Sequence, residues 1–246
     1  MSRWLIVGAA GGIASATARE LASRGHQLVL ADVPEQEERL KGDADDLRLR
    51  YGITVETELF EALEEKKHTA LLDKAEKSAP LEGVLWAAGV MWPQEELQAD
   101  PGKAEEHHRI NYTSAMRFLS LVADRFEERK SGQIVAIGSP AGDRGRQSNY
   151  LYGADKAALH VFMQGLRQRL AKAGVNVLTI KPGPTHTPMT AGMEKLPLPS
   201  QPADVAKGIA RAIDKRCEVA YVPGIWRLIM ITLRHIPEAL FKKVKM

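Results

Sequence analysis

A phenol and an ammonium group are four residues apart in this chain, at Tyr152 and Lys156, and Ser139 supplies a hydroxyl group thirteen residues before the tyrosine. Side chains at positions i and i+4 of a helix share one face, so helical structure from about residue 149 places the phenol and the ammonium group in one site. An unperturbed tyrosine titrates near about 10, and a nearby cation favours the phenolate, which moves the group toward proton transfer at neutral pH. The alternative is an ordinary surface pair on a helix, because this spacing is common.

The hydrophobic pattern predicts the elements that position these groups. The β-type run Gln133–Ile137 precedes Ser139, so the hydroxyl group lies at the carboxyl end of a strand, where open α/β sheets bind ligands. Short apolar runs and longer segments of helical periodicity alternate along the chain, which requires a parallel sheet with right-handed crossovers in one α/β domain. The predicted strands are 3–7, 27–31, 53–55, 81–88, 133–137, 176–180 and 218–222, and the predicted helices are 15–24, 35–51, 59–78, 104–129, 149–172 and 203–215.

Glycine residues follow the first predicted strand, at Gly8, Gly11 and Gly12. They allow a tight turn and a close approach to a pyrophosphate, whose charge the N-terminus of the next helix favours. Asp32 ends the second strand about 20 residues further on, where an acid can bind the 2′-hydroxyl of a ribose. The alternative is that Asp32 caps the following helix. A mobile lid over the site is expected at residues 189–202, which are rich in proline and small residues.

Composition excludes several classes of protein. The chain has 246 residues, 44% hydrophobic and 26% charged, and a net charge of +3 that is too small and too spread to indicate nucleic-acid binding. The single cysteine, Cys217, excludes an internal disulfide and is expected to be a buried small residue. His107 and His108 lack ligand-spaced partners, so we expect them to be solvated and expect no metal site. The sequence shows no leader segment and no apolar run of 18 residues, which predicts a cytoplasmic protein.

Together these features resemble the short-chain dehydrogenase/reductase family over residues 3–223. That family has a Rossmann-type, doubly wound parallel sheet of about seven strands, and the resemblance implies the same fold here. The matching motifs are the glycine turn G-x-x-x-G-I-[GA] at Gly8–Ala14, A-A-G at Ala87–Gly89, Asn111 within a helical segment, Ser139 before Tyr152 in Y-G-A-D-K, and P-G-x-x-x-T at Pro182–Thr187.

The resemblance assigns roles to these residues. It implies that Tyr152 donates a proton to a carbonyl oxygen as hydride arrives, and that Ser139 hydrogen-bonds that oxygen. Lys156 would acidify the phenol and bind the nicotinamide ribose, and Asn111 would hold a water molecule that links Lys156 to solvent. NAD(H) is the expected cofactor, and NADP(H) is disfavoured, because Asp32 would repel a 2′-phosphate. The residues expected to bind the cofactor are Gly8, Gly11, Gly12, Ile13, Asp32, Ala88, Gly89, Tyr152, Lys156, Pro182, Gly183, Thr185 and Thr187.

Some positions depart from the family pattern. Ala14 replaces the usual third glycine, Trp86 and Ala87 replace the usual asparagines, and no aspartate is clearly placed after the third strand. These departures affect the adenine pocket rather than the reaction. Only three residues separate Tyr152 from Lys156, whereas enoyl reductases of this superfamily place six between their tyrosine and lysine. The spacing therefore favours carbonyl reduction.

Residues 224–246 have an amphipathic helical pattern that breaks or restarts at Pro237. Five Lys or Arg residues against one Glu, with Trp226 at the start, favour an interfacial helix on an anionic membrane. The alternative is a helix that packs on the substrate lobe or on another subunit, because periodicity alone does not distinguish the two. The apolar positions are Trp226, Ile229, Leu233, Ile236, Leu240 and Val244, and the basic positions proposed to face phosphates are Arg227, Arg234, Lys242 and Lys245.

Within the family, the chain from Gln133 onward resembles the reductases of decaprenylphosphoryl-2-keto-ribose, which reduce a 2-keto furanose on a lipid carrier with NADH. The resemblance implies a cytoplasmic protein, peripheral on the inner face of the cell membrane, that forms a homodimer or homotetramer. One alternative is a soluble reductase of 3-oxoacyl thioesters, polyols or keto sugars. Another is a non-catalytic dinucleotide sensor, which is expected to lack the tyrosine or the lysine, and both are present here.

Overall fold

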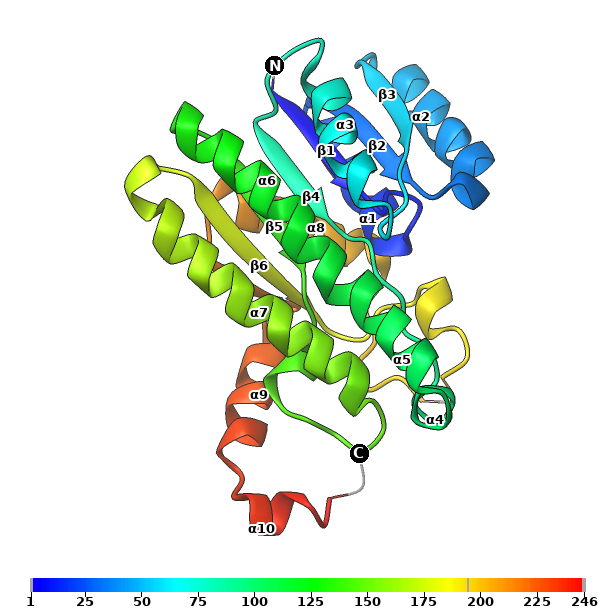
Figure 1. Cartoon of the computed structure of the whole chain (residues 1–246), viewed down its shortest axis with the longest axis vertical. Helices are drawn as coiled ribbons and strands as arrows, with labels where there is room; N and C mark the ends of the chain where they lie inside the picture. Colours follow the sequence, from blue (N-terminus) through cyan, green and yellow to red (C-terminus); the bar gives the residue numbers. More distant parts are fainter. Residues whose placement is uncertain (1, 194, 245–246) are drawn as a thin grey trace.

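The computed structural model describes residues 2–193 and 195–244 and shows one sheet of seven strands in the order β3-β2-β1-β4-β5-β6-β7 (Figure 1). Every neighbouring pair of strands is parallel, as the alternation of strand and helix predicts. The strands are β1 (Arg3–Val7), β2 (Gln27–Asp32), β3 (Val55–Leu59), β4 (Gly83–Trp86), β5 (Gln133–Ile137), β6 (Asn176–Pro182) and β7 (Val219–Val222).

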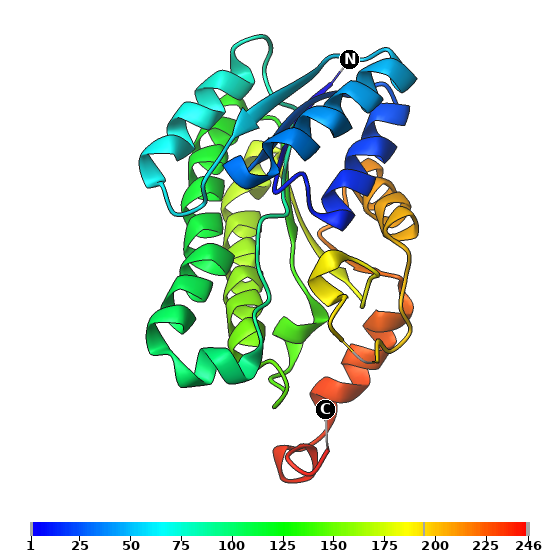
Figure 2. The ribbon, with the colours of Figure 1, turned by 90° about the vertical axis from the view of Figure 1, so that its right-hand side faces the viewer.

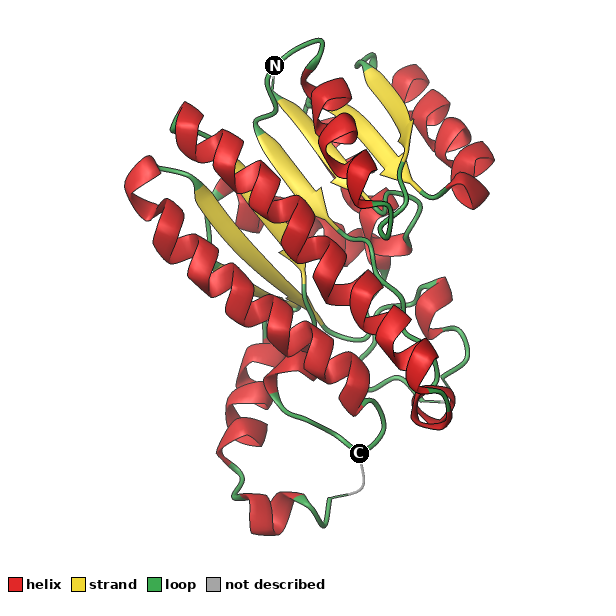
Figure 3. Cartoon of the chain, in the orientation of Figure 1, coloured by secondary structure: helices red, strands yellow, loops and turns green. Residues whose placement is uncertain are grey.

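Helices cover both faces of the sheet (Figures 2 and 3). Helices α1, α2 and α8 contribute to the apolar cluster on one face, and α3, α6 and α7 contribute to the cluster on the other. The helices are α1 (Gly12–Ser23), α2 (Glu37–Tyr51), α3 (Glu65–Glu76), α4 (Gln94–Ala99), α5 (Pro101–His108), a π-helical turn (Arg109–Thr113), α6 (Ser114–Arg129), α7 (Tyr150–Leu170), α8 (Pro202–Asp214), α9 (Ile225–His235), α10 (Glu238–Phe241) and 3₁₀ turns at Pro34–Gln36, Pro140–Asp143, Ala171–Ala173 and Pro188–Thr190.

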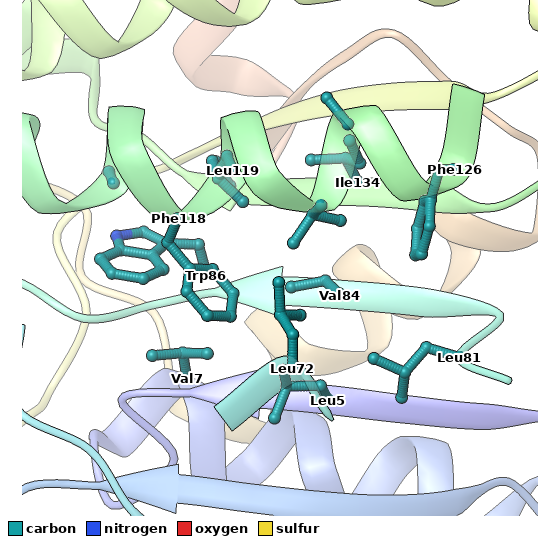
Figure 4. Packing of buried hydrophobic residues seen from close by; sticks show 14 of the residues in the cluster. Leu5, Val7, Leu72, Leu81, Val84, Trp86, Phe118, Leu119, Phe126 and Ile134 are labelled. Atoms are coloured by element: carbon teal, nitrogen blue, oxygen red, sulfur yellow. The ribbon is translucent and has the colours of Figure 1, made fainter. Parts of the chain in front are cut away.

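The two apolar clusters follow from the two-residue period of the strands. In β1, Trp4 and Ile6 belong to one cluster, whereas Leu5 and Val7 belong to the other. Figure 4 shows the second cluster, where Leu5 and Val7 meet the side chains of α3 and α6. Trp86, which stands where the family usually has an asparagine, lies in this cluster. Its ring centre is 5.4 Å from that of Phe118, so the indole fills the core under the carboxyl edge of the sheet.

Three expectations about local structure were wrong. The third strand was predicted at 53–55, but β3 is Val55–Leu59. This strand lies at the edge of the sheet and pairs with β2. Its backbone hydrogen bonds to β2 hold Glu56 and Glu58 in extended conformation, although the segment has no apolar run. Helix α3 begins at Glu65 rather than at residue 59. Cys217 is half-buried rather than buried.

The carboxyl ends of the strands form one edge of the sheet, and the motifs lie along it. The glycine turn follows β1, Gly89 follows β4 after two residues, Ser139 follows β5 and the P-G-x-x-x-T segment begins at the end of β6. Strands β1 and β4 are neighbours although β2 and β3 intervene in the sequence, so the strand order reverses between them. Open α/β sheets bind ligands at such a reversal.

Candidate active site

Tyr152 and Lys156 lie together near the N-terminal end of α7, as their spacing predicts. The Nζ atom of Lys156 is 5.5 Å from the centre of the Tyr152 ring, and both side chains are buried. The same Nζ donates a hydrogen bond of 3.2 Å to the carbonyl oxygen of Ile137, the last residue of β5. The pair is therefore not a surface pair on a helix, and α7 holds it against the carboxyl edge of the sheet.

Burial determines the protonation of this pair. It raises the pKa of Tyr152 to about 12, although a hydrogen bond with Ser139 acts in the opposite direction. It also lowers the pKa of Lys156 to about 8, although the nearby carboxylate of Asp155 acts against this shift. The sequence analysis expected Lys156 to lower the pKa of the phenol. In this structure desolvation by burial outweighs the lowering effects of Ser139 and Arg146, so the pKa lies above its ordinary value. At neutral pH Tyr152 is a protonated phenol, which can donate a proton.

Ser139 lies two residues beyond β5, in extended conformation at the start of the 3₁₀ turn Pro140–Asp143. Its Oγ accepts a hydrogen bond of 3.1 Å from the backbone N–H of Ala141. Its own backbone N–H lies 3.4 Å from Nε2 of His160, on α7. The serine is thus fixed from the turn on one side and from α7 on the other, and its hydroxyl group interacts with the phenol of Tyr152.

A buried polar cluster that the sequence analysis missed supports this turn. Asp143 accepts hydrogen bonds of 2.5 Å from Nζ of Lys181 and 2.5 Å from the hydroxyl group of Tyr221, and it lies 3.4 Å from Nδ1 of His160. Burial alone would raise the pKa of Asp143, but these three partners lower it to about 2. The one available signal was Lys181, a charged residue within β6, a strand whose residues are all buried.

Asn111 lies in the π-helical turn Arg109–Thr113 and is fully buried. Its Oδ1 accepts from the N–H of Val90 at 3.0 Å, and its Nδ2 donates to the carbonyl oxygen of Val90 at 3.0 Å. The amide therefore fixes the loop after β4. A Cβ at Gly89 would stand 2.8 Å from Asn111 Oδ1 and 3.5 Å from Lys156 Nζ, which places the amide beside the ammonium group.

His107, four residues before Asn111, is the clearest correction to the sequence analysis. His107 was expected to be solvated, but it is 1% exposed and its Nδ1 lies 2.8 Å from a carboxylate oxygen of Asp155. His108 is exposed, as expected, and its Nδ1 lies 2.7 Å from the other oxygen of the same carboxylate. Periodicity could not reveal this, because the partner Asp155 is on α7, more than 40 residues away in the sequence.

The glycine turn packs closely on the loops after β4 and β6. Gly8 has φ +81°, and a Cβ there would stand within 2.5 Å of the backbone nitrogen of Ala88, so only glycine fits. A Cβ at Gly12 would stand 2.9 Å from Thr187 Cγ2, which shows how closely the loop after β6 approaches the turn. Helix α1 has no side-chain cap at Gly11, so its first N–H groups can bind an anion.

Asp32 bonds the backbone around the glycine turn instead of capping a helix. Its Oδ2 accepts from the N–H of Ala10 at 2.7 Å and its Oδ1 accepts from the N–H of Val33 at 2.8 Å. The following 3₁₀ turn has no side-chain cap. The carboxylate is therefore held at the end of β2 beside the turn. Ile13, another residue expected to bind the cofactor, is half-buried in the first turn of α1.

The loop after β6 is built on threonine hydroxyl groups. Thr185 is buried and donates to the carbonyl oxygen of Gly183 at 2.9 Å. Thr187 caps the turn Pro188–Thr190, and Thr190, which the sequence analysis missed, donates to the carbonyl oxygen of Thr185 at 2.6 Å. Pro182 is the last residue of β6. The expected lid, residues 189–202, follows this loop, and its residue 194 lies outside the described part of the chain. Near the end of the lid, the N–H of Ser200 donates a hydrogen bond of 2.9 Å to the carbonyl oxygen of Pro184.

These residues fit a nicotinamide dinucleotide. The glycine turn leaves room for backbone to approach a pyrophosphate, the free N-terminus of α1 favours its charge, and the carboxylate of Asp32 lies where a ribose is expected. Ser139, Tyr152 and Lys156 lie along the same carboxyl edge of the sheet, beyond β5. In the part of the chain that the structure describes, no three His, Cys, Asp or Glu residues are arranged to hold a metal ion.

Comparison with known proteins finds similar sequences and folds over nearly the whole chain. The sequence profile described as "short chain dehydrogenase" matches residues 3–196. The chain is 33% identical to an uncharacterized oxidoreductase of Streptomyces coelicolor over 98% of this chain and 94% of that protein. It is 30% identical to an uncharacterized oxidoreductase of Mycobacterium tuberculosis over 98% of this chain and 96% of that protein. Among solved structures, a short-chain dehydrogenase from Sphingobium yanoikuyae in complex with NADPH is similar, with a TM-score of 0.85, 26% identity and coverage of 100% of this chain and 97% of that chain.

Proposed function

The chain belongs to the short-chain dehydrogenase/reductase family of oxidoreductases, and from this premise we propose that it reduces the carbonyl group of a substrate that also carries an anionic group. The observation that supports carbonyl reduction most strongly is the buried, protonated phenol of Tyr152 between Ser139 and Lys156. A bound nicotinamide cofactor supplies the hydride. The experiment is NADH and NADPH oxidation against a panel of keto sugars and 3-oxoacyl thioesters, with and without a lipid phosphate.

In this mechanism the residues around the carbonyl group act on its oxygen. The hydroxyl group of Ser139 donates a hydrogen bond to that oxygen and stabilises the negative charge that develops on it. Tyr152 then transfers its phenolic proton to the oxygen. Lys156 is protonated below about pH 8, so its charge stabilises the phenolate that forms. Burial of Tyr152 and Lys156 excludes water from these two groups, which strengthens their interactions.

We propose NAD(H) as the preferred cofactor, on the basis of Asp32. Its carboxylate is fixed by the N–H groups of Ala10 and Val33 and cannot turn away without losing both bonds. Such a carboxylate accepts a hydrogen bond from a ribose 2′-hydroxyl and repels a 2′-phosphate. The protein of Sphingobium yanoikuyae was solved with NADPH, so cofactor choice in this chain is a sharp test of the role of Asp32.

Arg146 supports an anionic substrate. It lies in the loop between Ser139 and Tyr152, and its charge lowers the pKa of the Tyr152 phenol, against the larger effect of burial. Among the described residues, its buried Nε has no hydrogen-bond partner. A guanidinium group near the reacting phenol with an unused donor suits a phosphate or carboxylate. The keto sugar of a polyprenyl phosphate has both the carbonyl group and the phosphate.

The position of the C-terminal segment is relevant to where the protein binds such a substrate. Figure 2 shows α9 and α10 below the body of the molecule, beyond the carboxyl ends of the strands. Arg144, in the same loop as Arg146, donates to the carbonyl oxygen of Ile236 at 3.1 Å and pairs with Glu238 at 2.7 Å. The C-terminal segment is thus joined to the loop between Ser139 and Tyr152. We propose that it meets an anionic membrane surface and a lipid-linked substrate there.

A soluble substrate is the second candidate, and the burial of Trp226 favours it. The sequence analysis placed this indole in a membrane, but it is 6% exposed, and Ile229, Leu233 and Ile236 are half-buried. The exposed apolar side chains of the tail are instead Ile225, Leu228, Ile231, Leu240 and Val244. The two candidates predict different dependence on a lipid phosphate in the substrate panel. In the described part of the chain, no helix is long and apolar enough to cross a membrane.

A further inference from the structure

The side chain of His160 lies beside Ser139 but has no role in the proposed reaction. It follows Lys156 by four residues on α7, so the two side chains share one face of the helix. His160 is 5% exposed. A Cβ on Gly138 would stand 2.4 Å from its Nε2, and a Cβ on Gly142 would stand 2.9 Å from its Cε1. Two glycines, one before Ser139 and one after it, therefore leave the space that the imidazole occupies.

The contacts of the ring determine which of its nitrogens carries the proton. The backbone N–H of Ser139 can only donate, and it points at Nε2 over 3.4 Å, so Nε2 is the acceptor. The proton of the neutral ring is then on Nδ1, which lies 3.4 Å from Oδ1 of Asp143 and donates toward it. Asp143 also accepts from Lys181 and Tyr221, and with a pKa of about 2 it stays ionised. A fixed carboxylate thus selects the tautomer that can hold the serine.

Protonation of His160 would remove the contact with Ser139. An imidazolium carries N–H groups on both nitrogens, so Nε2 would face the backbone N–H of the serine donor to donor. The charged groups that act on the ring are Asp143 in the turn, Lys181 on β6 and Lys156 on α7. Burial and the two lysines lower the pKa of His160, and this outweighs the opposite effect of Asp143. The ring is therefore neutral near pH 7 and becomes charged only in acid.

We propose that His160 is a positioning residue, which holds the backbone of Ser139 so that the serine hydroxyl group points at the carbonyl oxygen of the substrate. This inference rests on the proposed function, because the hydroxyl group stabilises the negative charge that develops on that oxygen. Such a donor is effective when it is fixed before the reaction. The turn supplies one contact to the serine, at the N–H of Ala141, and α7 supplies the other through His160.

Two amide variants separate the two contacts of the ring. In His160→Gln the longer side chain can place an oxygen near the position of Nε2 and accept from Ser139, whereas in His160→Asn the shorter one reaches only the position of Nδ1, near Asp143. With a keto substrate that wild type reduces, kcat of the Asn variant near pH 7 is expected to fall by about tenfold, less than the roughly 10²- to 10³-fold cost of removing an oxyanion donor. The Gln variant is expected to keep most of its kcat, and the affinity for NADH is expected to change little in both.

A double-mutant cycle with Ser139→Ala tests whether His160 acts through the serine. In the Ser139→Ala background, His160→Asn is expected to have no further effect on kcat, because no hydroxyl group remains to be positioned. A further loss of about tenfold in that background would overturn the proposal, since the imidazole would then act on another part of the site.

The pH profile of kcat is a second readout. Tyr152 and Lys156 have pKa values of about 12 and about 8, so neither of them changes charge on the acid side of neutrality. In wild type, kcat is expected to fall as the pH decreases below the ordinary histidine pKa of about 6.5, and His160→Gln is expected to reduce this fall. The matched control is His68→Gln, which changes another buried histidine, on α3, and is expected to keep the wild-type profile.

The outcomes distinguish this role from the proposed function. An unchanged kcat in His160→Asn, or a fall of kcat in acid that His160→Gln retains in full, would overturn the positioning role while the reductase activity of wild type stands. A wild-type protein that reduces no carbonyl compound would instead remove the proposed function, and the role of His160 with it.

Discussion

The indole ring of Trp226 packs directly on Gly183, so closely that a Cβ on residue 183 would overlap it. This contact joins the start of α9 to the loop after β6, where Thr185 and Thr187 lie. At the other end of the tail, the guanidinium group of Arg144 lies 4.4 Å from the centre of the Phe241 ring. The C-terminal segment is therefore attached to two loops of the active site, and changes in it can reach the site.

We expect the double variant Lys242→Glu and Lys243→Glu to release the protein from anionic vesicles. Near-surface basic residues each contribute roughly 1 kcal/mol to such binding. Each substitution removes one attractive charge and adds a repulsive one, so the double variant loses several such contributions. Flotation with vesicles that contain phosphatidylserine measures the effect, and Lys215→Glu on the body of the protein is the control. Binding that does not change would favour the soluble substrate. Lys245, also expected to face phosphates, lies outside the described residues.

Tyr152→Phe is expected to lower kcat by at least about 10²-fold, because a positioned proton donor typically contributes 10²- to 10⁴-fold. Cofactor affinity, measured by the fluorescence of bound NADH, is expected to change little, since the phenol acts mainly in the transition state. Lys156→Ala is expected to lower both kcat and the affinity for the cofactor. More than about a tenth of wild-type activity in the Phe variant would place the acid elsewhere.

Asp32→Ser is expected to move the ratio of kcat/KM from NADH toward NADPH by on the order of tenfold or more, because it removes a charge that repels the 2′-phosphate. Steady-state kinetics with each cofactor measures the ratio. Asp43→Ser, a carboxylate that bonds Ser15 on α1, is the control for nearby negative charge. A wild-type protein that uses both cofactors equally would contradict the role of Asp32.

Arg146→Leu is expected to raise KM for a phosphate-bearing keto substrate by on the order of tenfold, because one charge-assisted hydrogen bond contributes about 1.5 to 3 kcal/mol. An uncharged analogue is expected to keep its KM. Arg146→Lys, which retains charge but loses the planar fork, should give an intermediate value. A uniform change for charged and uncharged substrates would mean that Arg146 shapes the loop rather than binding the anion.

Asp143 is expected to make stability depend on pH in acid. Its pKa is about 2 in the folded protein and 3.8 ordinarily, so its contribution is fully present above pH 3.8 and is lost as pH falls toward 2. The pKa difference corresponds to about 2 kcal/mol. Urea unfolding of wild type and Asp143→Asn at pH 7 and pH 2.5 measures it, with the exposed Asp124→Asn as control. A stability difference that is the same at both pH values would show that the partners do not act through the charge of Asp143.

The sequence alone was sufficient for the fold and for the placement of the motifs. Apolar runs with the two-residue period of strands and the 3.6-residue period of helices depend only on neighbouring residues, so they predicted β1, β5 and α7 closely. The parallel order of the strands then places Gly8, Ser139 and Thr185 at one edge. Four-residue spacing was enough to bring Tyr152 and Lys156 together.

Only the tertiary structure decided the electrostatics and the partners of these groups. The pKa of Tyr152 rises because packing removes it from water, and no local pattern measures that burial. His107 meets Asp155 48 residues later in the sequence, and Tyr221 meets Asp143 78 residues earlier. Trp226 is buried because Gly183, in the loop after β6, leaves space for its ring. Desolvation and ion pairing depend on contacts between distant segments, whereas periodicity reports only which face of an element is apolar.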